Sequence, residues 1–264
     1  MNIFIRELKA NRKALIIWSV CMIVFVASGM MKFTAYSEGG ASSDVFAKLP
    51  YSIKALFGMG SFDITKAAGF FAFLFLYIEL TVAIHAVLLG AGIIAKEESD
   101  KTTEFLMIKP VSRGNIITSK LLAALFNVVV INIVTLITSI LMVASYNKGK
   151  DVTGEIAMFM LSMFIVQLIF LSLGAVIAAF LKNPKASGAL GIGILLIAFV
   201  VCEITNLTNK IDFINILSPF KYFSYGDMVT GKGINIVITL LALVLIGVFT
   251  FATHFFYKKR DLNI

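Results

Sequence analysis

The sequence predicts an all-α, polytopic membrane protein with six transmembrane helices. The chain has 264 residues, of which 59% are hydrophobic and only 14% are charged, about half the charged share of a soluble globular domain. Its mean hydropathy is +0.95, and its apolar residues form long continuous runs. A soluble domain of this length needs more polar residues to cover its surface, so we expect lipid to cover the apolar side chains.

Six apolar runs are long enough to span a 30 Å hydrocarbon core, which takes about 20 helical residues. We place them in one transmembrane domain, residues 1–264, with spans at about 14–31, 67–95, 119–144, 155–181, 186–205 and 234–257. The runs are continuous rather than alternating, which favours helices over strands. The first run is longer than the apolar segment of a typical signal peptide, so we expect it to be retained as the first span.

The distribution of charge predicts the orientation of the helices. The chain has 23 Lys and Arg against 15 Asp and Glu, a net charge of +8. With six spans, both termini lie on one side, and the pieces on that side are 1–13, 96–118, 182–185 and 258–264. Lys and Arg are roughly twice as dense there as in the other loops, so we expect both termini in the cytoplasm. We assign the positive charge to contact with anionic headgroups and expect no nucleic-acid partner.

The inner loop between the second and third spans is the densest cluster of charge. An apolar run, 105–108, follows several acidic residues, and Pro110 ends any helix there. Phe105 and Leu106 can project on one side while Glu97, Glu98, Asp100 and Lys101 stay solvated. This pattern is typical of a helix that docks in a groove of a partner; a polar loop folded onto its own membrane domain is the alternative. The candidate docking residues are Glu97, Glu98, Asp100, Glu104, Phe105, Leu106, Pro110 and Arg113.

Two outer segments combine apolar residues with a helix-breaking proline. Residues 45–59 interleave apolar and basic side chains around Pro50, which predicts a short amphipathic helix in the outer interface or, alternatively, a plain connector. Residues 217–223 are interrupted by Pro219 and rich in aromatic side chains, which predicts a re-entrant segment or an interfacial anchor.

The spans also contain polar side chains. Glu79 lies near the middle of the second span, where a charge costs about 3 kcal/mol, so it is protonated or faces protein or water. A packing or gating role and a substrate or proton path both remain open for it. His85 does not share a helix face with Glu79, and we expect a structural role. Gln167, Asn127 and Asn132 are mid-span amides, for which we expect interhelical hydrogen bonds.

Pairs of small residues four apart predict close helix contacts in the second and fifth spans. They are Ala86/Gly90, Ser187/Gly191 and Ala189/Gly193.

No recognisable catalytic or metal-binding motif is present in the sequence. It has no phosphate-binding loop, no zinc-protease motif and no nucleophile elbow. Its two cysteines, Cys21 and Cys202, lie in apolar runs, which argues against a disulfide framework or a zinc site. We therefore expect a protein that is not an enzyme, with no catalytic residue and no metal site.

Several segments resemble those of ABC-2 type permeases, the membrane subunits of ATP-driven ABC transporters. Residues 97–113 resemble the family's segment after the second span: an acidic stretch, Thr103 and Glu104, an apolar turn, and the Pro-x-Ser-Arg of 110–113, with Lys120 opening the next span. The Pro-Phe segment before the last span, the aromatic-basic Arg-Asp-Leu ending and the first outer loop are similar too. These matches lie at 217–222, 256–262 and 49–58.

The resemblance implies a six-helix half-transporter, an exporter in most members, that pairs with a second copy or with a homologous permease. Separate cytosolic ATPase subunits would bind ATP and Mg²⁺, and this chain would bind no cofactor. The inner loop would be the coupling helix that docks in the ATPase, and residues 3–13 an amphipathic interface helix. We expect a multi-pass protein of a bacterial plasma membrane. The alternatives are a secondary transporter or ion channel that uses Glu79, or a membrane assembly or sensing subunit.

Overall fold

The computed structural model describes residues 3–37, 50, 63–104, 111–147, 151–181, 183–207, 212–229 and 233–259, and in these ranges it is helical without strands. Among the described residues, six helices are long and apolar enough to cross a membrane, which confirms the predicted six-span all-α fold. They are α1 (Ile3–Met31), α5 (Ala67–Ser99), α7 (Arg113–Tyr146), α8 (Thr153–Phe180), α9 (Pro184–Leu207) and α11 (Ile236–Lys259). Shorter elements are α2 (Phe33–Tyr36), η1 (Asp212–Leu217), η2 (Pro219–Lys221) and α10 (Tyr225–Val229).

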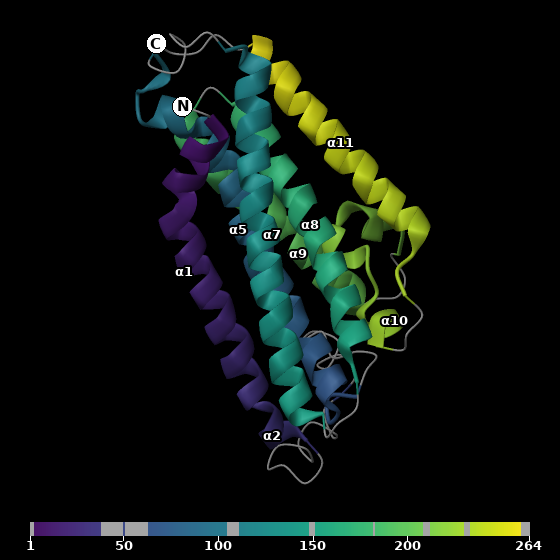
Figure 1. Cartoon of the computed structure of the whole chain (residues 1–264). Coiled ribbons are helices and arrows are strands. Elements are labelled where there is room, and N and C mark those ends of the chain that lie inside the picture. Colours follow the sequence, from purple (N-terminus) through teal and green to yellow (C-terminus); the bar gives the residue numbers. More distant parts are fainter. Residues whose placement is uncertain are drawn as a thin grey trace.

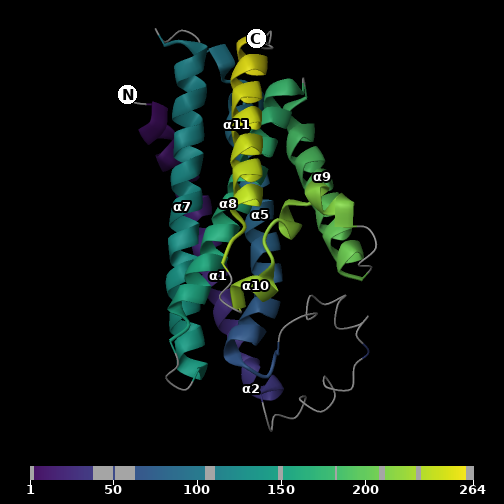
Figure 2. The same ribbon diagram turned by 90° about the vertical axis from the view of Figure 1, so that its right-hand side faces the viewer.

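The helices α5 and α8 form the centre of the bundle and pack against one another more extensively than any other pair. Helices α1 and α7 cover one side of this pair, and α9 and α11 cover the other (Figures 1 and 2). Most of the apolar residues of α5 and α8 are buried, whereas those of the outer helices are largely exposed. An apolar surface of this extent matches the surroundings of a bilayer.

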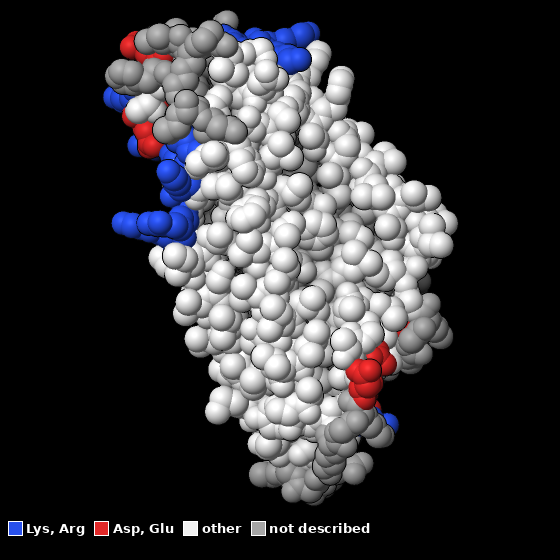
Figure 3. All heavy atoms as spheres, in the orientation of Figure 1, with Lys and Arg blue, Asp and Glu red and all other residues white. Residues whose placement is uncertain are grey.

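Both termini lie at one end of the bundle, together with the connection from α5 to α7 (Figure 1). Lys and Arg gather at this end, while the broad flank of the bundle shows no charged residue in the same view (Figure 3). This distribution agrees with the predicted topology. The assignment of this end to the cytoplasm remains a prediction from the charge bias.

Residues 3–13 do not form the separate interface helix that the sequence led us to expect. They are the first turns of α1, which runs without a break into the first span. No proline or glycine interrupts residues 3–28, so nothing forces a bend at the membrane surface. Ile3 and Glu7 are buried against the bundle, and α1 therefore carries its N-terminal charges to neighbouring helices.

The connection from α9 to α11 folds back into the bundle. The Ser218 hydroxyl donates to the carbonyl of Ala198 on α9 at 2.7 Å. Phe220 is buried, with its ring centroid 5.2 Å from that of Phe170 on α8 and 5.6 Å from that of Phe199 on α9. The segment thus packs into the bundle as a re-entrant segment does, and its depth in a membrane stays a prediction. The interfacial helix expected at 45–59 lies outside the described residues, apart from Pro50.

The contact between α5 and α8 depends on two glycines that face one another. A Cβ atom on Gly90 would lie 2.1 Å from the carbonyl oxygen of Leu171, and one on Gly174 would lie 2.2 Å from that of Val87. Only residues without a side chain permit this approach of two backbones. The predicted close contact at Ala86/Gly90 is thus present. In the fifth span, a Cβ atom on Gly191 would lie 2.8 Å from a methyl carbon of Val87, whereas one on Gly193 would meet no described atom within 4 Å.

Candidate functional site

The inner loop leaves α5 through a tight helix end. The amide of Thr102 donates to the carbonyl of Glu97 at 2.8 Å, and the amide of Lys101 donates to that of Glu98 at 3.3 Å. Lys101 has a φ of 55°. These are the bonds of a Schellman motif, in which glycine usually occupies the left-handed position. At the other end of the loop, the Ser112 hydroxyl accepts from the amide of Asn115 and caps α7.

A buried carboxylate joins the two helices that carry this loop. Glu97, in the last turns of α5, accepts a hydrogen bond from the Nζ atom of Lys120 on α7. The same Nζ atom donates to the carbonyl of Ile93 at 2.6 Å. Lys120 is 0% exposed and Glu97 is 4% exposed. Two charges buried to this degree persist only when they are paired and their hydrogen bonds are satisfied.

The N-terminal turns of α1 complete the charge balance. Arg6 donates from Nη2 to Glu97 Oε1 at 2.5 Å and to Glu7 Oε1 at 2.8 Å. Glu7 is 0% exposed, and its second oxygen lies 3.8 Å from Lys96 Nζ. We call Arg6, Glu7, Lys96, Glu97 and Lys120 the ion cluster. It links α1, α5 and α7 directly beneath the inner loop.

The ion cluster corrects one expectation about the loop. Glu97 is buried between helices instead of solvated, because its two oxygens satisfy one cation from α7 and one from α1. Asp100, Lys101 and Glu104 are exposed, as expected. Glu98 is half-buried. Phe105, Leu106 and Pro110 lie outside the described residues, so the predicted coupling helix stays a prediction.

Arg113 lies at the start of α7 and contacts the last span. Its Nη1 atom donates to the carbonyl of Lys258, near the end of α11, at 3.3 Å. A cation there also interacts favourably with the C-terminal end of a helix. This hydrogen bond therefore ties the start of α7, where the inner loop ends, to α11.

A second polar contact lies within the membrane-spanning part. Tyr225 of α10 donates from its hydroxyl to Glu79 Oε2 on α5 at 2.5 Å. Glu79 is 1% exposed. The Tyr225 ring packs against two phenylalanines that contact one another, with centroid distances of 5.5 Å to Phe75 and 6.0 Å to Phe159. Glu79 thus faces protein, and its partner comes from the re-entrant segment.

The other polar residues of the spans have structural contacts. The Asn132 amide on α7 donates to Gln167 Oε1 on α8 at 2.8 Å, the kind of interhelical hydrogen bond that we expected. Asn127 instead donates to the carbonyl of Ala123 in its own helix. His85 stacks near Trp18 of α1, with ring centroids 4.9 Å apart. In the described ranges, no group of three or more His, Cys, Asp or Glu is placed to hold a metal ion.

A comparison with family models decides the class of protein. The model of the ABC-2 family transporter proteins matches residues 1–262. The chain belongs to this family. No curated protein matches it. Members of the family are typically non-catalytic membrane subunits that associate with an ABC ATPase, and the six apolar helices agree with a multi-pass permease.

Several residues that organise the permease were missed by the sequence analysis. Arg6 and Lys96 entered only the count of basic residues that predicts the orientation, Glu7 was not considered, and Lys120 was noted only as part of a family resemblance. A signal for Lys120 existed, because a lysine followed by a long apolar run needs a partner once it is buried. Tyr225 had no such signal, since it is 146 residues from Glu79.

We expect Tyr225→Phe to lower the free energy of unfolding of the permease by about 1–3 kcal/mol, because it leaves the buried carboxyl of Glu79 without its donor. The measurement is thermal unfolding of the purified protein in mild detergent. The double change Glu79→Leu/Tyr225→Phe should recover much of the loss, since it removes both polar partners. Tyr77→Phe is the matched control, because it removes a hydroxyl from α5 and leaves the Glu79–Tyr225 contact intact. Equal stability of Tyr225→Phe and Tyr77→Phe would contradict the contact.

Proposed function

We propose that this permease forms the translocation path of an ATP-driven exporter and that its inner loop, residues 96–113, docks on a separate ATPase subunit. The ATPase would bind ATP and Mg²⁺. A second copy of the permease, or a homologous one, would complete the path in the plasma membrane. Family membership supports the transporter, and the ion cluster supports the role of the loop.

The ion cluster supports coupling because it makes the base of the loop rigid. A docked partner can shift the membrane helices only if force on the loop reaches them without being lost in local bending. Glu97 is bonded to both Lys120 and Arg6, so a displacement of the end of α5 acts on α7 and α1 together. The exposed Asp100 and Glu104 leave polar side chains available to a partner.

The role that we propose for Glu79 is structural. Its hydrogen bond to Tyr225 holds the re-entrant segment against α5, and its carboxyl is buried in protein. This contact favours an ATP-driven transporter over a secondary transporter or an ion channel that uses Glu79. Transport driven by an ion gradient without ATP would reverse that preference.

The proposal is tested by the double change Phe105→Asp/Leu106→Asp in vesicles that contain the complete transporter. Burying a phenylalanine or leucine side chain contributes about 1.5–3 kcal/mol, so losing both from a docking contact should weaken it more than tenfold. We expect ATP-driven transport to fall by at least about tenfold while the permease still inserts.

The control for this test is Val111→Asp, which places the same charge on an exposed residue of the same loop. It should transport almost normally. Unchanged transport by the double variant, or an equal loss in Val111→Asp, would count against docking through the 105–106 pair.

A further inference from the structure

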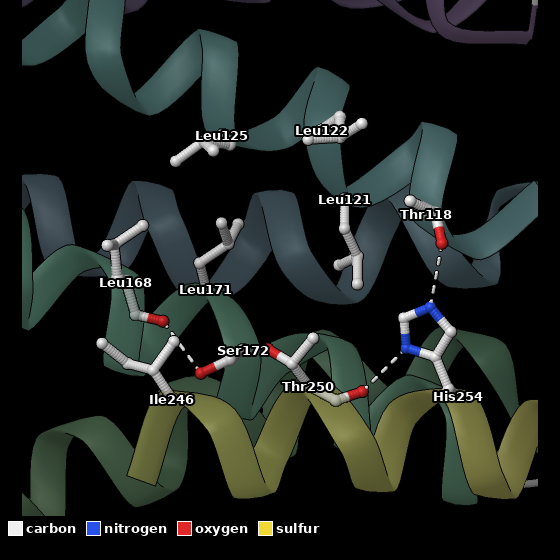
Figure 4. Close-up of a pocket in the computed structure, with 10 residues that line it drawn as sticks. All are labelled: Thr118, Leu121, Leu122, Leu125, Leu168, Leu171, Ser172, Ile246, Thr250 and His254. Atoms are coloured by element: carbon white, nitrogen blue, oxygen red, sulfur yellow. Dashed lines mark hydrogen bonds between the residues drawn. The ribbon is translucent and has the colours of Figure 1, made fainter. Parts of the chain in front are cut away.

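An apolar groove lies between α7 and α11, with α8 as its floor (Figure 4). The two helices meet near the end that carries the termini and diverge away from it (Figure 1). The groove has a volume of about 280 Å³. Its apolar lining consists of leucines and one isoleucine: Leu121, Leu122 and Leu125 on α7, Leu168 and Leu171 on α8, and Ile246 on α11.

A polar contact joins the two walls at one end of the groove. Thr118 Oγ1 on α7 lies 3.1 Å from His254 Nε2 on α11. His254 Nδ1 donates to the carbonyl of Thr250 at 2.9 Å, because a carbonyl oxygen only accepts. Figure 4 shows both contacts at the same end of the groove.

Polar side chains are few in the lining: Thr118, Ser172, Thr250 and His254. The Ser172 hydroxyl on the floor lies 2.8 Å from the carbonyl of Leu168 and 2.9 Å from that of Ile169, and Thr118 and His254 contact one another. A water molecule needs two to four polar partners. We therefore expect the groove to hold an apolar group, and in a bilayer that group is a lipid acyl chain.

Beyond this contact, the rim of the groove is basic. Lys258 and Lys259 end α11 and are exposed, with Lys259 Nζ 4.1 Å from the centroid of the Phe255 ring. Arg113 is held beside them through its hydrogen bond to the carbonyl of Lys258. A cationic rim next to an apolar groove matches an anionic headgroup joined to a hydrocarbon chain.

We propose that this groove binds an anionic phospholipid of the surrounding leaflet, with one acyl chain between α7 and α11 and its headgroup at Lys258 and Lys259. The acyl chain of the bound lipid would fill the space between α7 and α11. No residue of the inner loop lines the groove itself, so the proposal goes beyond the proposed coupling to an ATPase.

The test measures lipid retained by the full chain after extraction from vesicles of phosphatidylcholine and phosphatidylglycerol, using native mass spectrometry. We expect retained phosphatidylglycerol to exceed phosphatidylcholine by about tenfold, since each nearby cation adds a several-fold preference. Leu121→Trp and Leu168→Trp fill the groove from two different helices and should abolish retention. Leu141→Trp places the same side chain on the exposed face of α7 and should retain lipid normally.

The headgroup is tested separately with Lys258→Gln/Lys259→Gln, which should remove the preference for phosphatidylglycerol while some lipid is still retained. Lys9→Gln/Lys13→Gln makes the same charge change on exposed residues of α1 and should keep the preference. Equal retention of the two lipids by the unmodified chain would overturn the proposal. So would normal retention in both groove-filling variants, or the same loss in Leu141→Trp.

Discussion

Replacing Lys120 by methionine is expected to lower the free energy of unfolding by about 3–5 kcal/mol, the usual cost of removing one partner from a buried ion pair. The Nζ atom of Lys120 bonds both Glu97 and the carbonyl of Ile93. Without it, the carboxylate of Glu97 stays buried with only Arg6 for balance. Methionine keeps most of the length and volume of lysine, so the loss reports the charge and not a cavity.

The matched control is Lys101→Met, which removes the same charge from an exposed residue next to the ion cluster. It should change stability by less than about 0.5 kcal/mol, as for most surface substitutions. Thermal unfolding in detergent, followed by size-exclusion chromatography of the surviving protein, measures both variants. If Lys120→Met unfolded at the same temperature as Lys101→Met, the buried pair would not exist.

The paired change Glu97→Gln/Lys120→Met separates charge from packing. Glutamine retains an oxygen that can accept from Arg6, and the double variant no longer buries an unbalanced carboxylate. Replacing both members of a buried pair is often close to neutral, so we expect the double variant to recover more than half of the lost stability. A double variant that is less stable than Lys120→Met would mean that Glu97 acts through other contacts.

Gly174→Ala is expected to destabilise the bundle by about 1–3 kcal/mol, the range for an overpacked site. The new Cβ atom would lie 2.2 Å from the carbonyl oxygen of Val87. A backbone atom cannot rotate aside as a side chain does, so α5 and α8 must separate. The loss should appear even though alanine favours an isolated helix over glycine by about 1 kcal/mol.

Gly92→Ala provides the control for this substitution. Gly92 is on α5, two residues from Gly90, and a Cβ atom there meets nothing within 4 Å. It should leave stability unchanged or raise it by about 0.5–1 kcal/mol. The two variants are compared by their unfolding temperatures in the same detergent. A stabilising effect of Gly174→Ala would show that the two helices are farther apart than described.

The spans were predictable because hydropathy is a local property. Each predicted span falls within, or within two residues of, a helix of the structure. At the end of α5 and the start of α7, the helices extend beyond the predicted spans, because the polar residues there are still compatible with a helix. The extension of α5 puts Glu97, which lies beyond the predicted second span, within reach of Lys120 in the first turns of the third.

The charged residues were harder to place, since a charge looks solvated until its neighbours are known. Glu97 was assigned to the solvated side of the loop, whereas Lys120 and Arg6 bury it. A continuous α1 was needed for this result, because a separate interface helix would have carried Arg6 and Glu7 away from α5. The hydrogen bond between Asn132 and Gln167 was easier to predict, since a mid-span amide has few possible partners other than a polar group of another helix.

The amino-acid sequence by itself determined the membrane class, the six helices, the absence of a phosphate-binding loop and the likeness to a transporter subunit. It did so because lipid solvation acts on each segment separately and because motifs are short. The tertiary structure alone decided which side chains meet: Glu97 with Lys120 and Arg6, Glu79 with Tyr225, and Gly90 with the backbone of α8. Those contacts depend on the rotation and depth of each helix against its neighbours, which no local pattern specifies.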